Sequence, residues 1–500
     1  MAWMADCRKT HNICAHARMN LELPKRVLDL SASDDRVSLH VSQPGELVPY
    51  ATLSYRWGRG VPLKTTTHTI DRHRAGIPLD DFPLTLRESV MLARGLGFRY
   101  LWIDALCIIQ DSPADWAEQA AAMTSIYQGS SLNIAIADAP SRDTGTVSIL
   151  GDNCLHVASS GVSGKSAEIL IAARSFAVEP TNKAPSLSSR GWVFQETLVS
   201  VASLFVTGSG LIWECCSAKF HETGESTRDS IHSINSSKSE WASCQASQIR
   251  DDNSMYPTRM RAWHNWMAHF SLRNLTNKGD KLPAVAGLAS HFSAFGSTYA
   301  AGLWMEDIHV GLTWFAAHAG TLVRRNDRAP SWSWASVDGA FEYPRWLTIT
   351  KYGAAVHKTN DIDLDVLEVS VNETKPGTFG SVSGGYIKSI ATLYQGTVCG
   401  DSRNPQIHFD TEDAKILKYT IDESVQFGDQ PKAFWLARVC SVTLVPDSSR
   451  GKYVFYLILE EMDSRRSMFR RIGLAQGSEE RSHLRSLQRP DSNRRNITLL

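Results

Sequence analysis

The sequence has no long apolar run of the kind that a membrane-spanning helix requires. Its 500 residues contain no stretch of about 18 consecutive apolar side chains, and the N-terminal segment carries basic residues where a signal peptide has an apolar core. The chain also has no net charge, because 52 Lys and Arg residues balance 52 Asp and Glu residues. We therefore expect a cytoplasmic protein with no membrane span and no nucleic-acid partner.

Sequence motifs of several common enzyme classes are also absent. The chain has no GxGxxG, no GxxxxGK[ST] and no HExxH, so Rossmann redox chemistry, P-loop nucleotide switching and zinc proteolysis have no support. No repeat of fixed period occurs. The nine cysteines form an odd set at irregular spacings, which is typical of reduced thiols and not of a disulfide framework. We expect no tightly bound cofactor.

The N-terminal half alternates between strand and helix patterns. The alternation and the apolar spacing predict strand, helix, strand, helix and strand in turn at residues 48–55, 84–97, 99–110, 115–127 and 131–139. A further helix is predicted around residues 189–200, followed by two strands within 204–216. This order predicts an α/β fold with a parallel sheet, in which ligands sit at the carboxyl ends of the strands.

The remaining patterns divide the chain into segments of different character. We expect a helical lead-in at residues 1–47, which contains one strand-like segment, LPKRVLDL, and an α/β domain at 48–220 with a Ser- and Gly-rich insertion at about 138–188. We expect four further segments after this domain: a polar linker at 221–255, a helical region at 256–328, a β-rich region at 329–476 and a disordered tail at 477–500.

Three motifs in the α/β domain resemble those of fungal heterokaryon-incompatibility (HET) domains. They are YATLSYRWG at residues 50–58, LWIDALCIIQD at 101–111 followed by Trp116, and RGWVFQE at 190–196. The order and spacing match the family. The lead-in Cys7-x-x-x-His11-x-x-Cys14 and the segment APSWSWASVD at 329–338 are also similar to parts of long family members. The chain is thus identified as a member of the HET family.

This resemblance implies a fold and a function. HET domains resemble TIR domains, so the implied fold is a TIR-like (flavodoxin-like) parallel sheet, and the implied role is fungal self/non-self recognition and programmed cell death. Trp192 and Glu196 have the Trp-x-x-x-Glu form of the helix that carries the catalytic glutamate in NAD-cleaving TIR enzymes. The chain is therefore a candidate NAD glycohydrolase with NAD as its substrate. The alternative is a non-enzymatic signalling or scaffold module that acts by HET domain association. In either case the expected partner is a second copy of the chain or another incompatibility protein.

NAD cleavage assigns a role to several residues. Loss of nicotinamide leaves an oxocarbenium-like ribose, which the Glu196 carboxylate would stabilise. Tyr55 or Trp57 would stack on a flat ring, and Arg56 would bind a phosphate. Asp104, at the end of a strand, would accept a hydrogen bond from a ligand hydroxyl.

Each of these residues also has a plainer interpretation. Glu196 is equally consistent with a helix-surface carboxylate or a cap of its own helix, and Asp104 is better explained as holding backbone amides. Cys107, among apolar neighbours, is expected to be a buried inert thiol. The enzyme hypothesis requires Glu196 to point towards Trp57; it fails if the helix at 190–199 lies on the far side of the sheet.

Cys7, His11, Cys14 and His16 are four metal-ligating residue types within ten positions. On one short helix these four residues could not surround a tetrahedral ion, and the sequence contains no CxxC pair that could complete a zinc site with them. Cys215 and Cys216 would face opposite sides of a strand. The sequence therefore favours a packed helix face and no metal site.

Overall fold

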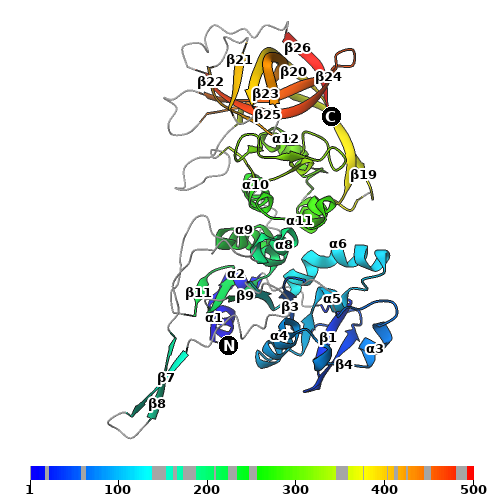
Figure 1. Cartoon of the computed structure of the whole chain (residues 1–500), viewed down its shortest axis with the longest axis vertical. Coiled ribbons are helices and arrows are strands. Elements are labelled where there is room, and N and C mark those ends of the chain that lie inside the picture. The colour runs from blue at the N-terminus through cyan, green and yellow to red at the C-terminus, as the bar shows by residue number, and fades with distance from the viewer. Residues whose placement is uncertain are drawn as a thin grey trace. The chain divides into compact units, whose positions relative to one another are not determined.

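The computed structural model forms two compact units, Met1–Asp252 and Asn253–Leu500 (Figure 1). Each unit is described separately below. The structure describes residues 2–16, 22–57, 63–137, 154–160, 166–172, 187–207, 210–222, 234–246, 256–294, 296–344, 359–375, 377–401, 404–409, 415–423, 426–443, 452–479 and 493–500. None of the helices among these residues is both long enough and apolar enough to cross a membrane.

The first unit contains a large mixed sheet with helices around it. Its elements in chain order are α1 (Ala2–Thr10), α2 (Asn12–His16), β1 (Arg26–Ser33), β2 (Arg36–Val41), β3 (Tyr50–Ser54), α3 (Ile70–Ala75), β4 (Ile77–Pro78), α4 (Leu84–Gly95), β5 (Tyr100–Trp102), α5 (Asp104–Cys107), α6 (Pro113–Gly129), β6 (Leu132–Ile136), β7 (Cys154–Ser160), β8 (Ser166–Ala172), α8 (Gly191–Val199), β9 (Ala202–Thr207), β10 (Gly210–Cys215), β11 (Lys219–His221) and α9 (Ile234–Ala246).

The sheet has nine strands in the order β11-β10-β9-β6-β3-β5-β1-β2-β4. The four central strands β9, β6, β3 and β5 are parallel, as the alternating pattern predicted, and the strands on either side pair antiparallel. Every residue of β3, β5 and β6 is buried, and the buried polar side chains of Thr52, Ser54 and Asn133 hydrogen-bond to one another between β3 and β6. The fold is therefore α/β, but its sheet is mixed and not purely parallel.

Three segments of the first unit differ from expectation. The predicted strand at 99–110 ends at Trp102, because Asp104 begins the short helix α5. The lead-in contributes strands β1 and β2 to the large sheet, so it is helical only in its first part, and β1 confirms the strand-like LPKRVLDL. The expected polar linker contains helix α9, in which Trp241 is 2% exposed.

Strands β7 and β8 form a separate two-stranded hairpin within the expected insertion. The remainder of residues 138–186 lies outside the described part of the chain. Helices α8 and α9 lie side by side, and α8 also packs against α6 (Figure 1). Ser112 caps α6 by accepting a hydrogen bond from the amide of Asp115, and Pro113 occupies its first turn. Serine at the cap and proline in the first turn are both favoured at helix starts.

The second unit begins with helices and short strand pairs and continues into long strands. Its elements are α10 (Tyr256–Ser271), α11 (Pro283–Ser293), β12 (Tyr299–Ala300), β13 (Leu303–Trp304), α12 (Ile308–Gly311), β14 (Phe315–Ala316), β15 (Val323–Arg324), β16 (Val337–Asp338), β17 (Phe341–Glu342), β18 (Thr359–Ile362), β19 (Asp365–Glu373), β20 (Val382–Asp401), β21 (Asn404–Phe409), β22 (Lys415–Ile421), β23 (Gln426–Thr443), β24 (Lys452–Asp463), β25 (Met468–Glu479) and β26 (Arg494–Leu499).

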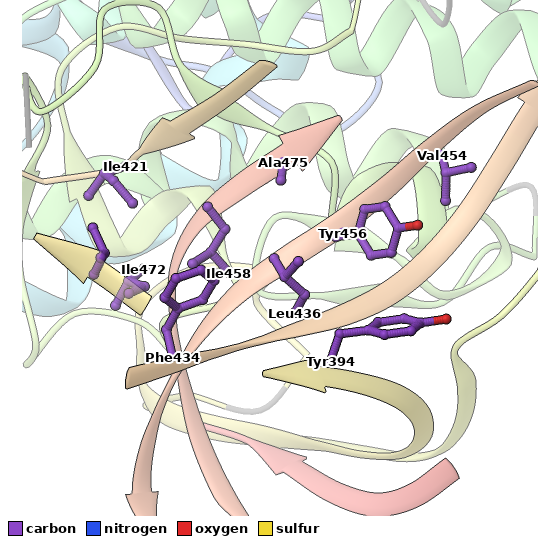
Figure 2. Close-up of a cluster of buried hydrophobic side chains, with 10 residues drawn as sticks. Tyr394, Ile421, Phe434, Leu436, Val454, Tyr456, Ile458, Ile472 and Ala475 are labelled. Atoms are coloured by element: carbon purple, nitrogen blue, oxygen red, sulfur yellow. The ribbon is translucent and has the colours of Figure 1, made fainter. Parts of the chain in front are cut away.

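The long strands pair in a closed ring. The order β23-β24-β25-β26-β20 returns to its start, because β20 also pairs with β23. Apolar side chains from several of these strands form a buried cluster, which Figure 2 shows around Phe434, Leu436 and Tyr456. The expected β-rich region is confirmed. The expectation of a disordered tail is wrong for the end of the chain, since β26 pairs with β20 along six residues. Residues 480–492 lie outside the described part.

The alternation of Trp332, Ser333 and Trp334 predicts a strand with both rings packed in the core, but strand β16 begins only at Val337. A 3-10 turn covers Trp334–Ser336, and both Trp332 and Trp334 are fully buried. Arg465, Arg466, Arg470 and Arg471 form a basic run that the balanced charge of the chain predicts to lie on a solvated hairpin. Arg471 is nevertheless 0% exposed. Its guanidinium forms an ion pair of 3.1 Å with the buried Asp422 and donates to the carbonyl of Leu312 at 2.6 Å.

Candidate functional site

The candidate site lies where β3 and β5 end and α8 begins. Carboxyl ends of parallel strands meet at one edge of a sheet, and β3 and β5 run parallel with Thr52 opposite Trp102. Helix α8 precedes β9, a further parallel strand, so its N-terminus starts at the same edge. Its first residue, Gly191, and all residues from Val193 to Val199 are buried. The predicted site residues on three separate motifs are thereby brought together.

Glu196 points into this edge of the sheet. The residue is only 8% exposed, and its carboxylate accepts a hydrogen bond from the hydroxyl of Ser54, the last residue of β3. Both plainer interpretations of Glu196, a surface carboxylate and a helix cap, are therefore wrong. Burial raises the pKa of Glu196 to about 7, although the Ser54 hydrogen bond and the positive charge of Arg190 oppose this rise.

Neighbouring side chains hold Ser54 and Glu196 in place. The amide oxygen of Asn133 on β6 lies 3.2 Å from the Ser54 hydroxyl. The Tyr127 hydroxyl donates to the carbonyl of Leu53 at 3.2 Å. Burial, and then the charges of Glu196 and Asp104, raise the pKa of Tyr127 well above its usual value. Tyr127 thus stays a neutral phenol beside the carboxylate.

Asp104 connects β5 to the segment that follows β3. Its carboxylate accepts a hydrogen bond from the Trp57 indole at 2.8 Å and another from the amide of Ala105 at 2.7 Å. Burial raises the pKa of Asp104, while the Trp57 hydrogen bond and the charge of Arg190 lower it. These contacts agree with the structural interpretation, in which Asp104 holds neighbouring groups. Its charge nevertheless reaches Glu196, whose pKa it raises.

The three residues after β3 differ in exposure. Tyr55 is 6% exposed, whereas Trp57 is 37% exposed, so only the Trp57 ring presents a large surface for stacking. Arg56 is half-buried. Gly58, the last residue of the first motif, lies with residues 59–62 outside the described part of the chain.

Sequence reasoning missed three residues of the site: Ser54, Tyr127 and Arg190. Arg190 lies just before α8, where its guanidinium donates to the carbonyl of Tyr55 at 2.5 Å, and its charge lowers the pKa of both Glu196 and Asp104. Arg190 is the first residue of the third motif, and an arginine at that place was a signal that pointed to it. Ser54 and Tyr127 gave no comparable signal, because a buried strand serine and a helix tyrosine are ordinary core residues.

Cys107 has the inert character that was expected. It is fully buried, its sulfur lies 3.5 Å from the amide of Ile103, and burial raises its pKa to about 12. A thiol that stays protonated at neutral pH is a poor nucleophile.

The N-terminal cysteines and His11 meet a cysteine from another part of the first unit. Helix α1 ends at Thr10 and α2 begins at Asn12, while backbone hydrogen bonds from His11 to Cys7 at 3.3 Å and from Ala15 to His11 at 3.1 Å continue across the break. Cys7, His11 and Cys14 then gather with Cys215, with all four potential ligand atoms within 4.8 Å of one another. The side chain of His16 lies outside the described part of the structure.

Comparison with known proteins identifies the domain that carries the Glu196 site. No curated protein and no solved structure matches the chain. Residues 50–196 match the model of the family described as Heterokaryon incompatibility protein (HET). The match begins at the first residue of β3 and ends at Glu196, so it spans all the predicted site residues. The chain therefore carries a heterokaryon-incompatibility (HET) domain at residues 50–196.

Proposed function

We propose that this protein acts in the cytoplasm in fungal self/non-self recognition and programmed cell death, and that it does so by cleaving NAD at the Glu196 site. The HET domain supports the recognition role. The observation that carries the enzymatic part is the position of Glu196: a buried carboxylate at the carboxyl edge of the sheet, bonded to Ser54 and close enough to Asp104 and Arg190 to sense their charges.

The strand order supports a TIR-like core. Counted along the chain, the four parallel strands are β3, β5, β6 and β9, and in the sheet they follow the order β5-β3-β6-β9. This second, first, third, fourth order is the beginning of the flavodoxin-like arrangement, whose ligand sites lie where the strand order reverses. The reversal falls between β3 and β6, beside Ser54 and Asn133.

The reaction we propose is hydrolysis of the glycosidic bond between nicotinamide and ribose. The carbon–nitrogen bond breaks, and its electron pair leaves with nicotinamide. Positive charge develops on the ribose, where the Glu196 carboxylate stabilises it. Water then adds to the ribose carbon and loses a proton, which gives ADP-ribose. Because the pKa of Glu196 is about 7, turnover should rise as the pH increases through neutrality.

The surrounding residues suit the other parts of NAD. The exposed Trp57 ring would stack on a base, and its hydrogen bond to Asp104 fixes its orientation. Arg56 would bind a phosphate. Arg190 keeps part of the Glu196 population ionised at neutral pH, because its positive charge favours the carboxylate.

The test is NAD consumption by the whole chain, concentrated or tethered to force assembly. Glu196→Gln keeps the side-chain volume and should abolish nicotinamide release. Glu214→Gln is the matched control, because Glu214 on β10 is also buried, at 2% exposed, but has no part in the site. Turnover in the wild type and the control that is lost in Glu196→Gln supports the proposal.

A non-enzymatic signalling or scaffold module is the second candidate. Its support is the small exposed fraction of Glu196, 8%, together with the Ser54 hydrogen bond, since a buried and bonded carboxylate can serve the fold alone. In that case HET–HET association, or association with another incompatibility protein, transmits the signal. A folded, assembled wild type that releases no nicotinamide would refute the enzymatic proposal in favour of this one.

A further inference from the structure

Four potential metal ligands converge at the start of the chain. Cys7 lies on α1, His11 lies between α1 and α2, and Cys14 lies on α2, while Cys215 is the last residue of β10. The ligand atoms of all four lie within 4.8 Å of one another. The three cysteines are each 0% exposed, and His11 is half-buried.

The spacing of these atoms is close to that of a zinc site. In a tetrahedral site with Zn–S distances of about 2.3 Å and Zn–N distances of about 2.0–2.1 Å, ligand atoms lie about 3.5–3.8 Å apart. The Cys215 sulfur lies 3.4 Å from Nδ1 of His11. The four atoms therefore need only small shifts to surround one ion.

We propose that Cys7, His11, Cys14 and Cys215 bind a single zinc ion. Three thiolates and one imidazole are soft and borderline ligands that suit zinc, and they do not suit magnesium or calcium. Four protein ligands fill a tetrahedral shell and leave no open position for substrate. The site is therefore structural, and it is independent of the chemistry proposed at Glu196.

The three cysteines must lose their thiol protons in order to bind the ion. All three are buried, and buried charges require a partner of opposite charge. Zinc binding replaces the three thiol protons, which leave to solvent, and the ion compensates the three thiolate charges.

Neighbouring groups provide a second layer around the sulfur atoms. The Ser217 hydroxyl lies 3.6 Å from the Cys14 sulfur. The Cys216 thiol donates to the carbonyl of Val201 at 3.5 Å. Cys216 does not belong to the group of four. It supplies a matched control, because it is an adjacent buried cysteine that zinc does not require.

The proposed ion joins parts of the chain that are far apart in sequence. His11 and Cys215 are separated by 204 positions, and the ion would fasten α1 and α2 to the end of β10 in the large sheet. Helices as short as α1 and α2 have little stability of their own in water. We therefore expect removal of the metal to expose this N-terminal segment while the central strands stay folded.

The first test is the metal content of the whole chain, expressed without a histidine tag in zinc-supplemented medium and purified under reducing conditions. Elemental analysis should find one zinc per chain. The double variant Cys7→Ser/Cys215→Ser should lose it, and Cys216→Ser should keep it. Wild-type protein that holds no stoichiometric zinc, or a Cys216→Ser variant that loses zinc as completely as the double variant, would overturn the assignment.

A second test uses only the wild type, so it does not depend on the variants folding. Chelator-treated, reduced protein is titrated with Co²⁺ alone. We expect the visible bands of tetrahedral cobalt with thiolate charge-transfer absorption, saturating at one equivalent and displaced by Zn²⁺. Absence of these bands would refute the site. So would a disulfide between any two of the three cysteines in unreduced digests of freshly purified protein, because those thiols would then not be ligands.

Discussion

Replacing Glu196 by Gln should change how the stability of the first unit depends on pH. The pKa of Glu196 in the folded protein is about 7, against an ordinary value of 4.5. In the native state the carboxyl group therefore stays protonated up to about pH 7, while in the unfolded chain it ionises above pH 4.5. Between pH 4.5 and pH 7 the folded state therefore binds more protons than the unfolded state, so the unfolding free energy of the wild type falls as the pH rises. Glutamine does not ionise and lacks this loss.

The size of the effect follows from the two pKa values. A shift of one pKa unit corresponds to about 1.4 kcal/mol. The rise of the Glu196 pKa from 4.5 to about 7 on folding therefore corresponds to a loss of about 3 kcal/mol of unfolding free energy above pH 7. Glu196 is 8% exposed, so solvent screening reduces this figure little. Relative to the wild type, Glu196→Gln should therefore gain about 3 kcal/mol of unfolding free energy between about pH 4.5 and pH 8.

The assay must measure the first unit separately, because a chain of two units need not unfold in one step. Urea unfolding followed by pulse-labelling hydrogen exchange gives the unfolding free energy of peptides from β3 and α8 at each pH. Parallel profiles for wild type and Glu196→Gln would refute the reasoning, because Glu196 would then ionise normally in the folded protein.

Two further changes should weaken the second unit. Arg471→Met removes the 3.1 Å ion pair of the buried Asp422, which keeps only Arg324 at 3.8 Å, and should cost about 3 kcal/mol in urea unfolding of β25 peptides. Arg466→Met, whose side chain is 77% exposed, should cost almost nothing. Equal effects would contradict the burial argument. Gly302→Ala should lower the unfolding free energy by about 1–3 kcal/mol, because φ at residue 302 is +97° and a Cβ atom there would lie 2.7 Å from the Trp334 ring. A thermal melt measures this loss. An unchanged melting temperature would show that the ring moves freely.

The sequence by itself determined the α/β class and the HET match, and it supplied most residues of the candidate site. Tyr55 and Trp57 were predicted at a strand end because the alternation of residues 48–55 stops there, and strand ends on one edge of a parallel sheet must meet. Asp104 lies at the same edge because β5 ends at Trp102, well before the end of the predicted strand at 99–110. Glu196 came from a motif, and the structure places it at that same edge.

What the tertiary structure decided was burial and long-range contact. Local patterns do not report how deeply a helix residue is buried, so the raised pKa of Glu196 could not be predicted, nor could the burial of Arg471 in an apparently solvated basic run. Sequence spacing also treated Cys7 and Cys14 as one helix face. Only the tertiary structure shows that Cys215 from β10 joins Cys7, His11 and Cys14, because residues separated by some two hundred positions are brought together only by the packing of the whole unit.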